Sequence, residues 1–115
     1  MKSKYDLEER TFKYAKHVAL FCKKLPKTIP NREYIKQVIR SSGSVGANYI
    51  EANESLSKKD FAMRIKISRK ESKESAFWLK LLIETNSDNF KNEGLSLLRE
   101  SIELKKILSS IIQKI

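Results

Sequence analysis

The chain has few of the residues that break helices or build reactive sites. Its 115 residues include three glycines, two prolines, one cysteine and one histidine. Both prolines fall within residues 25–30, so one strong interruption of helical structure is expected. A single cysteine excludes an intrachain disulfide, and Cys22, among apolar neighbours, is expected to be a small buried side chain. With His17 alone, a histidine-rich metal site within one chain is excluded.

Long apolar runs and catalytic motifs are also missing. No segment approaches the length of a membrane span or a signal-peptide core, which predicts a cytoplasmic protein without a membrane partner. The chain lacks a phosphate-binding loop, a dinucleotide fingerprint and Glu-x-x-His pairs. Glu71 and Glu74 could serve acid–base chemistry, but no nucleophile or oxyanion site accompanies them. We expect no enzyme activity, no cofactor and no metal, and pairing of these carboxylates with Arg40, Arg69 or a neighbouring subunit.

Positive charge is plentiful. The formal net charge is +10, which favours an acidic partner, nucleic acid before an anionic surface. Residues 1–30 carry eight Lys and Arg against three Asp and Glu, and residues 57–87 carry eight against four. The excess charge is therefore concentrated in the first and third quarters of the chain.

Apolar periodicity predicts four helices, over about residues 6–25, 31–54, 57–84 and 93–114, in one domain covering residues 1–115. Asn31 is the expected N-cap of the second helix, and Ser57 that of the third, with Asp60 three residues later as in a capping box. No strand-like alternation is present. Short connections between long helices predict an all-α, antiparallel up-down-up-down four-helix bundle.

The periodicity also predicts which residues face inward. In the first helix these are Phe12, Ala15, Val18, Ala19, Cys22 and Leu25. In the third they are Phe61, Ile65, Ser68, Ser72, Ser75, Leu79 and Leu82, a heptad seam with serine in its middle. In the last they are Leu98, Ile102, Leu108, Ile111, Ile112 and Ile115, a face broader than one partner helix needs.

The second helix combines small residues with a polar row. Gly43 and Gly46 each cost about 1 kcal/mol relative to alanine in a helix interior, so another segment is expected to pack closely against them. Opposite Ile35, Val38, Ile39, Val45 and Tyr49 lies a row made of Gln37, Arg40, Ser44, Asn48 and Glu51. The polar row therefore gives this helix a second surface, in addition to its apolar face, whose role needs an explanation.

Basic side chains form two rows that could bind phosphates. The third helix places Lys59, Lys66, Lys70, Lys73 and Lys80 opposite its apolar seam. The first helix places Arg10, Lys13 and Lys24 outward. Such rows suit nucleic-acid phosphates without much sequence readout, although an ordinary solvated lysine face is the alternative. Phe77, in the same stripe, either stacks on a base or contacts a subunit. Trp78 and the broad face of the last helix indicate a homo-oligomer.

Three segments carry a resemblance to a known family. They are Gln37-x-x-Arg40-Ser41-x-x-Ser44-x-x-x-Asn48-x-x-Glu51-Ala52, Ser57-x-x-Asp60-Phe61 and Lys70-Glu71-x-x-Glu74-x-x-x-Trp78-Leu79. Together they closely resemble the four helix bundle protein family, whose members are also called 23S rRNA-intervening-sequence proteins. That label records that some members are encoded within insertions in bacterial 23S rRNA genes, and it does not demonstrate rRNA binding.

The resemblance implies a bacterial, non-enzymatic bundle that assembles as a ring-like homopentamer. A related protein, the accessory subunit of diversity-generating retroelements, is a basic pentamer that contacts nucleic acid and a reverse transcriptase. Carried onto this sequence, the motif positions Arg40, Ser44, Asn48, Glu51, Glu71 and Glu74 are expected to hold helices or subunits together. Two hypotheses follow: a basic homo-oligomer that binds RNA or DNA, or an adaptor that binds only itself and a protein partner.

Overall fold

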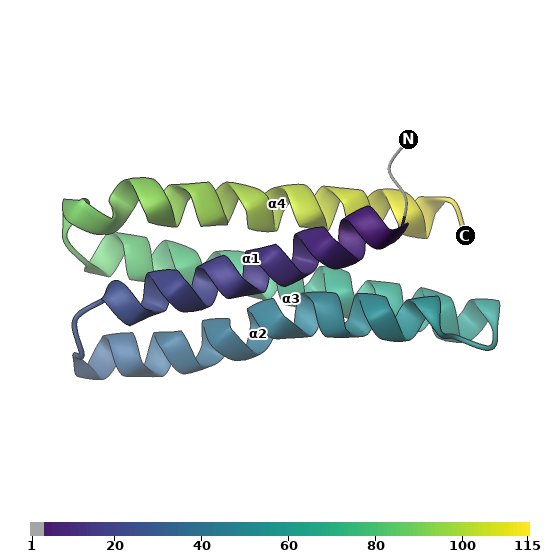
Figure 1. Cartoon of the computed structure of the whole chain (residues 1–115), viewed down its shortest axis with the longest axis horizontal. Helices are drawn as coiled ribbons and strands as arrows, with labels where there is room; N and C mark the ends of the chain where they lie inside the picture. The colour runs from purple at the N-terminus through teal and green to yellow at the C-terminus, as the bar shows by residue number, and fades with distance from the viewer. Residues whose placement is uncertain (1–3) are drawn as a thin grey trace.

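Four long helices make up almost all of the structure. The computed structural model describes the backbone of residues 4–115 and the side chains of residues 6–115. Its helices are α1 (Lys4–Lys24), α2 (Ile29–Asn53), α3 (Lys58–Thr85) and α4 (Lys91–Gln113), with a short 3-10 turn, η1 (Asp88–Phe90), before α4. No strand occurs in this part of the chain. The predicted all-α class and four helices are confirmed, and Figure 1 shows the helices side by side with the start of α1 and the end of α4 at one end.

Each helix packs against two neighbours, so α1 and α3 lie diagonally across the bundle. The α2–α3 and α3–α4 contacts are the most extensive, and the α1–α4 contact is the smallest. In Figure 1, α1 crosses the front of the molecule at an angle, with α3 behind it. The outward surface of α3 therefore lies on the opposite side of the bundle from α1.

The start of α2 differs from the prediction. Thr28, not Asn31, is the N-cap, and its hydroxyl oxygen accepts a hydrogen bond from the Asn31 backbone N–H at 3.2 Å. Asn31 is buried, and its side chain donates to the Pro26 carbonyl at 2.8 Å and to Asn86 at 2.9 Å. Asn86 donates back at 2.9 Å. Asn31 thus ties the α1–α2 connection to the end of α3, whereas Ser57 caps α3 as predicted, accepting from the Asp60 N–H at 3.0 Å.

The inward face of α1 is rotated from the predicted one. Val18, Cys22 and Leu25 are buried as expected, but Phe12 is 66% exposed. The buried residues of α1 that were not predicted are Leu7, Thr11, Tyr14 and Phe21, and Thr11 is the neighbour of Phe12 in the sequence. Two of these are polar, and both are satisfied inside the bundle: Thr11 donates to the Leu7 carbonyl at 2.9 Å, and the Tyr14 hydroxyl pairs with Ser101.

The same Tyr14–Ser101 pair changes the inward face of α4. The buried residues are Gly94, Leu97, Ser101, Leu104 and Leu108. Of the predicted set only Leu108 is fully buried, while Ile102 and Ile115 are 42% and 51% exposed. Ser101 is buried because both its partners, the Tyr14 hydroxyl and the Leu97 carbonyl, are internal.

Small residues let α2 approach its neighbours closely. The serine seam of α3 is buried as predicted, and the Ser68 hydroxyl donates to the Val45 carbonyl of α2 at 2.6 Å. On the other side of α2, a Cβ at Gly46 would lie 2.8 Å from the Thr11 hydroxyl oxygen of α1. Close packing was wrongly predicted for Gly43, since nothing lies within 4 Å of a Cβ there.

Candidate nucleic-acid interface

Five of the six lysines of α3 form an exposed row on one side of the helix. Lys59, Lys66, Lys70, Lys73 and Lys80 are all exposed. None of them lies within 4.0 Å of a carboxylate among the side chains of residues 6–115. They lie on the side of α3 opposite its buried seam of Ile65, Ser68, Ser72, Ser75, Leu79 and Leu82. At about 1.5 Å of rise per residue, the row extends over roughly 30 Å. We refer to it as the lysine row.

The basic side chains of α1 are instead engaged within the molecule. Arg10 binds Glu100 of α4 with two hydrogen bonds, Nε to Oε2 at 2.7 Å and Nη2 to Oε1 at 2.8 Å. The hydrogen bonds that Arg10 donates to Glu100 raise the pKa of Arg10 despite partial burial. Lys24 lies 3.0 Å from Glu93, and Lys13 lies 3.7 Å from Glu9. The predicted phosphate contacts of these three residues therefore compete with ion pairs inside the molecule, and no such pair involves the lysine row among the described side chains.

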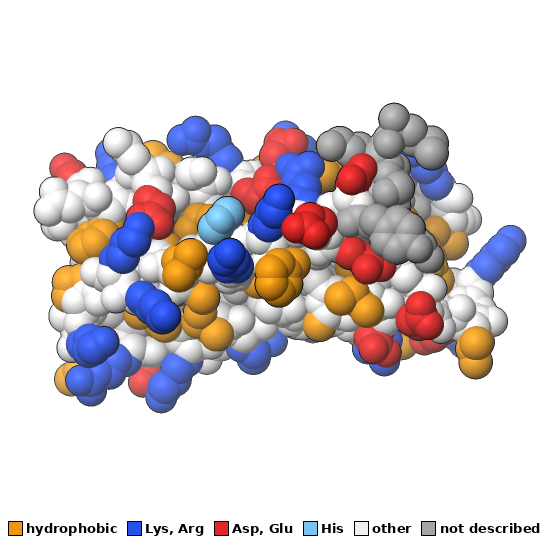
Figure 2. All heavy atoms as spheres, viewed as in Figure 1, with side chains coloured by type: hydrophobic (Ala, Val, Ile, Leu, Met, Phe, Trp, Pro, Cys, Tyr) orange, Lys and Arg blue, Asp and Glu red, His pale blue; other side chains and the backbone are white. Residues whose placement is uncertain are grey.

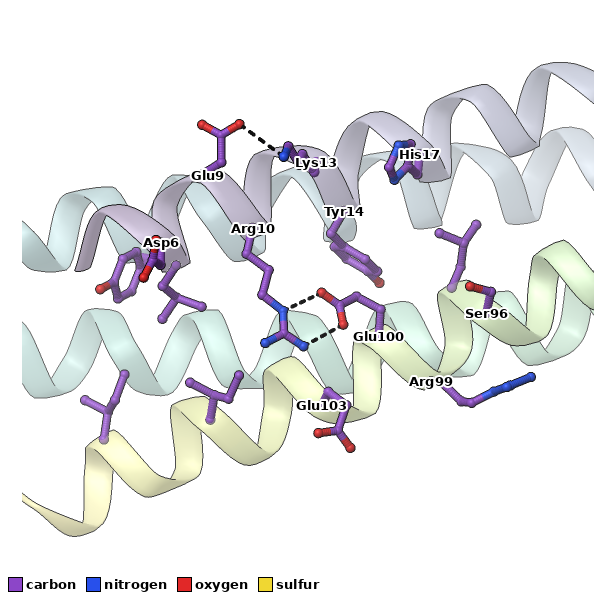
Figure 3. Close-up of a pocket in the computed structure, with 15 residues that line it drawn as sticks. Asp6, Glu9, Arg10, Lys13, Tyr14, His17, Ser96, Arg99, Glu100 and Glu103 are labelled. Carbon is purple, nitrogen blue, oxygen red and sulfur yellow. Dashed lines mark hydrogen bonds and ion pairs between the residues drawn. The ribbon is translucent and has the colours of Figure 1, made fainter. Parts of the chain in front are cut away.

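The Arg10–Glu100 and Lys13–Glu9 pairs border an open groove between α1 and α4. The groove has a volume of about 920 Å³ and an apolar floor that includes Leu7, Tyr49, Leu97 and Ile107. Figure 3 shows the Arg10–Glu100 pair crossing it, with Asp6, Glu9, Glu103, Lys13, His17 and Arg99 along its edges. Because positively and negatively charged side chains both line the groove, a row of phosphates would meet repulsion as well as attraction there.

The face that α1 covers is divided by charge. Figure 2 shows Lys and Arg gathered toward the end where α1 connects to α2, and Asp and Glu more frequent toward the other end. Exposed hydrophobic side chains lie between these regions. A single face of one sign is therefore not found on this side of the molecule.

The polar row of α2 connects it to α3. Arg40 donates to Glu74 Oε2 at 2.5 Å and to Glu71 Oε2 at 3.4 Å. The other Glu71 oxygen is buried and lies 3.3 Å from Arg40, close enough for attraction but without hydrogen-bond geometry. Of the partners expected for the two carboxylates (Arg40, Arg69 or a neighbouring subunit), the structure shows Arg40. This pairing joins two helices of one chain.

Asn48 makes a second connection in this row. Its side-chain nitrogen donates to the Ser44 hydroxyl at 2.9 Å, and its oxygen accepts from Arg64 of α3 at 3.2 Å. Gln37 and Glu51, at the two ends of the row, are exposed. Arg64 was not predicted from the sequence, although a positive charge on the helix after the polar row that contains Asn48 was a usable signal.

Three aromatic rings extend from this cluster to the lysine row. Trp78 donates its indole N–H to Glu74 at 3.1 Å and stacks on Tyr34 of α2, with ring centroids 6.0 Å apart. Phe77 meets Trp78 edge to face at a centroid distance of 5.0 Å and remains 57% exposed. Tyr34 was not predicted as part of the cluster because its position gave no pattern beyond an apolar helix face.

Other chemistry finds little support in the described residues. Cys22 is buried, and desolvation raises the pKa of its thiol to about 12, as expected for a packing residue. No three His, Cys, Asp or Glu side chains within residues 6–115 cluster as metal ligands would. Among the helices described, none is both long and apolar enough to cross a membrane.

Comparisons with known proteins match most of the chain. The family model of the 23S rRNA-intervening sequence protein matches residues 3–110. Among solved structures, the chain is similar to a protein of unknown function from the S23 ribosomal protein family of Bacteroides thetaiotaomicron. The two are 30% identical, the alignment covers 91% of this chain and 96% of that one, and the TM-score is 0.77. No curated protein matches the sequence.

Proposed function

The chain belongs to the 23S rRNA-intervening sequence protein family, and from that premise we propose that it is a non-catalytic, basic bundle that binds nucleic acid through phosphates. The observation that carries this proposal is the lysine row: five exposed ammonium groups on one helix face, without carboxylate partners in the described side chains. Contacts of this kind supply affinity and little sequence readout.

The proposal is tested by binding labelled RNA and DNA over a range of salt concentrations. Five phosphate contacts give a slope of log K against log salt of about −3.5 for a single strand and about −4.5 for a duplex. The variant Lys66→Glu, Lys70→Glu, Lys73→Glu is expected to abolish binding while keeping its helical circular dichroism. A salt-independent affinity, or full binding by this variant, contradicts the proposal.

A charge-matched control is available around α1. Lys16, Lys23 and Lys27 are exposed on α1 and the connection that follows it, and α1 lies diagonally opposite α3. Changing all three to Glu alters the net charge as much as the α3 variant does. If net charge alone drives binding, both variants lose it equally. If the lysine row is the site, the α1 variant keeps most of the affinity.

We further propose that the chain is an antiparallel up-down-up-down bundle that assembles as a homopentamer. Support comes from exposed large hydrophobic residues beside the α1–α2 contact: Phe12 of α1 and Ile39 and Ile50 of α2 are 66%, 42% and 46% exposed. An apolar surface of this kind is typical of an interface. Using it would leave the lysine row free. A reverse transcriptase as protein partner stays a prediction of the family resemblance.

Light scattering tests the assembly. A pentamer has five times the 13.4 kDa mass of one chain. The double variant Ile39→Asn, Ile50→Asn is expected to reduce that mass to one chain without loss of helix content. A wild-type protein that stays monomeric at high micromolar concentration contradicts the pentamer. Assembly without any nucleic-acid binding favours the adaptor alternative. Its candidate surfaces are the cluster of Arg40, Glu71 and Glu74 and the side of α3 around Trp78.

A further inference from the structure

The outward surface of α3 is more than a row of charges. Its lysines are interrupted at two places, Met63 and Phe77, and these complete an alternating spacing of four and three residues from Lys59 to Lys80. This spacing keeps side chains along one straight line of a packed helix. Met63 is 46% exposed and Phe77 is 57% exposed. Apolar and cationic groups therefore share one exposed line.

Phe77 is held in place from behind. Its ring meets Trp78 edge to face at 5.0 Å, and Trp78 in turn stacks on Tyr34 and donates to Glu74. Glu74 is fixed by Arg40 at 2.5 Å. More than half of Phe77 stays open to solvent although its neighbours restrict its position, as a preorganised contact surface requires.

Met63 forms part of a shallow depression in the same line. The depression has a volume of about 440 Å³ and is lined by Lys59, Ala62, Met63, Lys66, Ile67 and Lys70. Its apolar side chains come from the middle of this stretch and its three ammonium groups from around them. An apolar depression next to several ammonium groups fits a ligand in which a flat apolar part is joined to an anionic part.

We infer that the α3 surface binds single-stranded nucleic acid, with unstacked bases on Phe77 and in the Met63 depression and with phosphates on the lysine row. In a duplex the bases are stacked inside and only phosphates and sugars face a helix of this kind, so Phe77 and Met63 would gain no apolar contact. A single strand presents both parts, and exposed aromatic side chains within a positive track are typical of its binding surfaces. The inference rests on the proposed nucleic-acid function and narrows it to one class of ligand.

The test compares fluorescence anisotropy of labelled (dT)20, (rU)20 and a 20-base-pair duplex. Phe77→Ala and Met63→Ala are each expected to weaken both single strands by at least about fivefold. The salt slope should not change, because neither variant removes a charge. Duplex affinity should also stay constant. Phe77→Trp, which keeps an aromatic face, should retain single-strand binding. Leu20→Ala, an exposed apolar truncation on α1, serves as the control.

The outcomes separate the two proposals. Absence of binding to every oligonucleotide at low salt overturns the nucleic-acid function as well. If Phe77→Ala and Met63→Ala lose as much affinity for the duplex as for the single strands, or lose none for either, only the single-strand inference is overturned. Binding of poly-glutamate as tight as that of (dT)20 would show a purely ionic surface and overturns it too. Trp78, the chain's single tryptophan, provides an unlabelled readout, since stacking on adjacent Phe77 should change its fluorescence.

Discussion

Two glycines three residues apart in α2 have different surroundings, which makes them a matched pair. A Cβ at Gly46 would lie 2.8 Å from the Thr11 hydroxyl oxygen and 3.1 Å from the Thr11 Cβ. Thr11 cannot easily turn away, because its hydroxyl donates to the Leu7 carbonyl and lies 3.0 Å from that of Glu8. At Gly43 nothing lies within 4 Å.

We therefore expect opposite signs from the same substitution. Gly46→Ala should destabilise the protein by about 1–3 kcal/mol through overpacking against α1. Gly43→Ala should stabilise it by about 0.5–1 kcal/mol, because alanine costs less in a helix interior. Urea unfolding at fixed protein concentration measures both. Equal effects would show that the α1–α2 contact at Gly46 is looser than the structure has it.

A second prediction at this scale concerns Glu74 and pH. Partial burial raises the pKa of its carboxyl, but hydrogen bonds from Trp78 and Arg40 prevail, and the pKa lies below its ordinary value of 4.5. A lowered folded-state pKa stabilises the protein fully above the unfolded value, and this contribution is lost as pH falls through the folded-state pKa. Below about pH 5, wild type should thus lose more stability than Glu74→Gln.

The measurement is the free energy of unfolding at several pH values. Glu33→Gln is the control, since Glu33 is an exposed carboxylate of α2, 3.7 Å from Lys36. It should follow the wild-type curve. Parallel curves for wild type and Glu74→Gln would mean that the Arg40–Glu74 pair does not persist in solution.

At the scale of whole helices, much was predictable because periodicity is strong where a helix buries one continuous seam. The inner seam of α3 and its exposed lysines follow from heptad spacing alone. The buried faces of α1 and α4 could not be predicted from such spacing. Tyr14 and Ser101 pair across two helices, which no single-helix pattern reveals, and Thr11 donates to the Leu7 carbonyl of its own helix, while apolar Phe12 is left outside. Asn31 was misassigned for the same reason, since its partner Asn86 is 55 residues away.

The helices should also differ in local stability. α1 contacts its neighbours least, and the groove opens along its contact with α4. Local opening is easiest where few apolar contacts hold an element. In native-state hydrogen exchange, the amides of α1 should exchange with a lower free energy of opening than those of the α2–α3 seam.

A variant locates the cause of that difference. Arg10→Ala removes the bidentate contact to Glu100 and should lower protection further in α1 but not in α3. Lys36→Ala, which removes an exposed pair on α2, should change neither. Uniform protection of all four helices would show that the bundle opens only as one unit.

At the scale of the whole molecule, the two proposed surfaces occupy separate parts of the bundle. Phe12, Ile39 and Ile50 lie beside the α1–α2 contact, and the lysine row lies on α3, diagonal to α1. Copies joined through the first surface would each present an unoccupied lysine row. A long strand can then bind several subunits at once, and linked binding raises the overall affinity beyond that of one site.

This arrangement predicts that affinity depends on strand length only in the assembled protein. Wild type should bind a 60-nucleotide strand at least about 100-fold more tightly than a 10-nucleotide strand, in the usual range for linked sites. Ile39→Asn, Ile50→Asn, as a monomer, should bind the short strand as wild type does and lose most of the gain for the long one. Anisotropy with both strands at one salt concentration measures this. A monomeric variant that keeps the full gain would show that the length dependence does not come from linking subunits, and would contradict this arrangement.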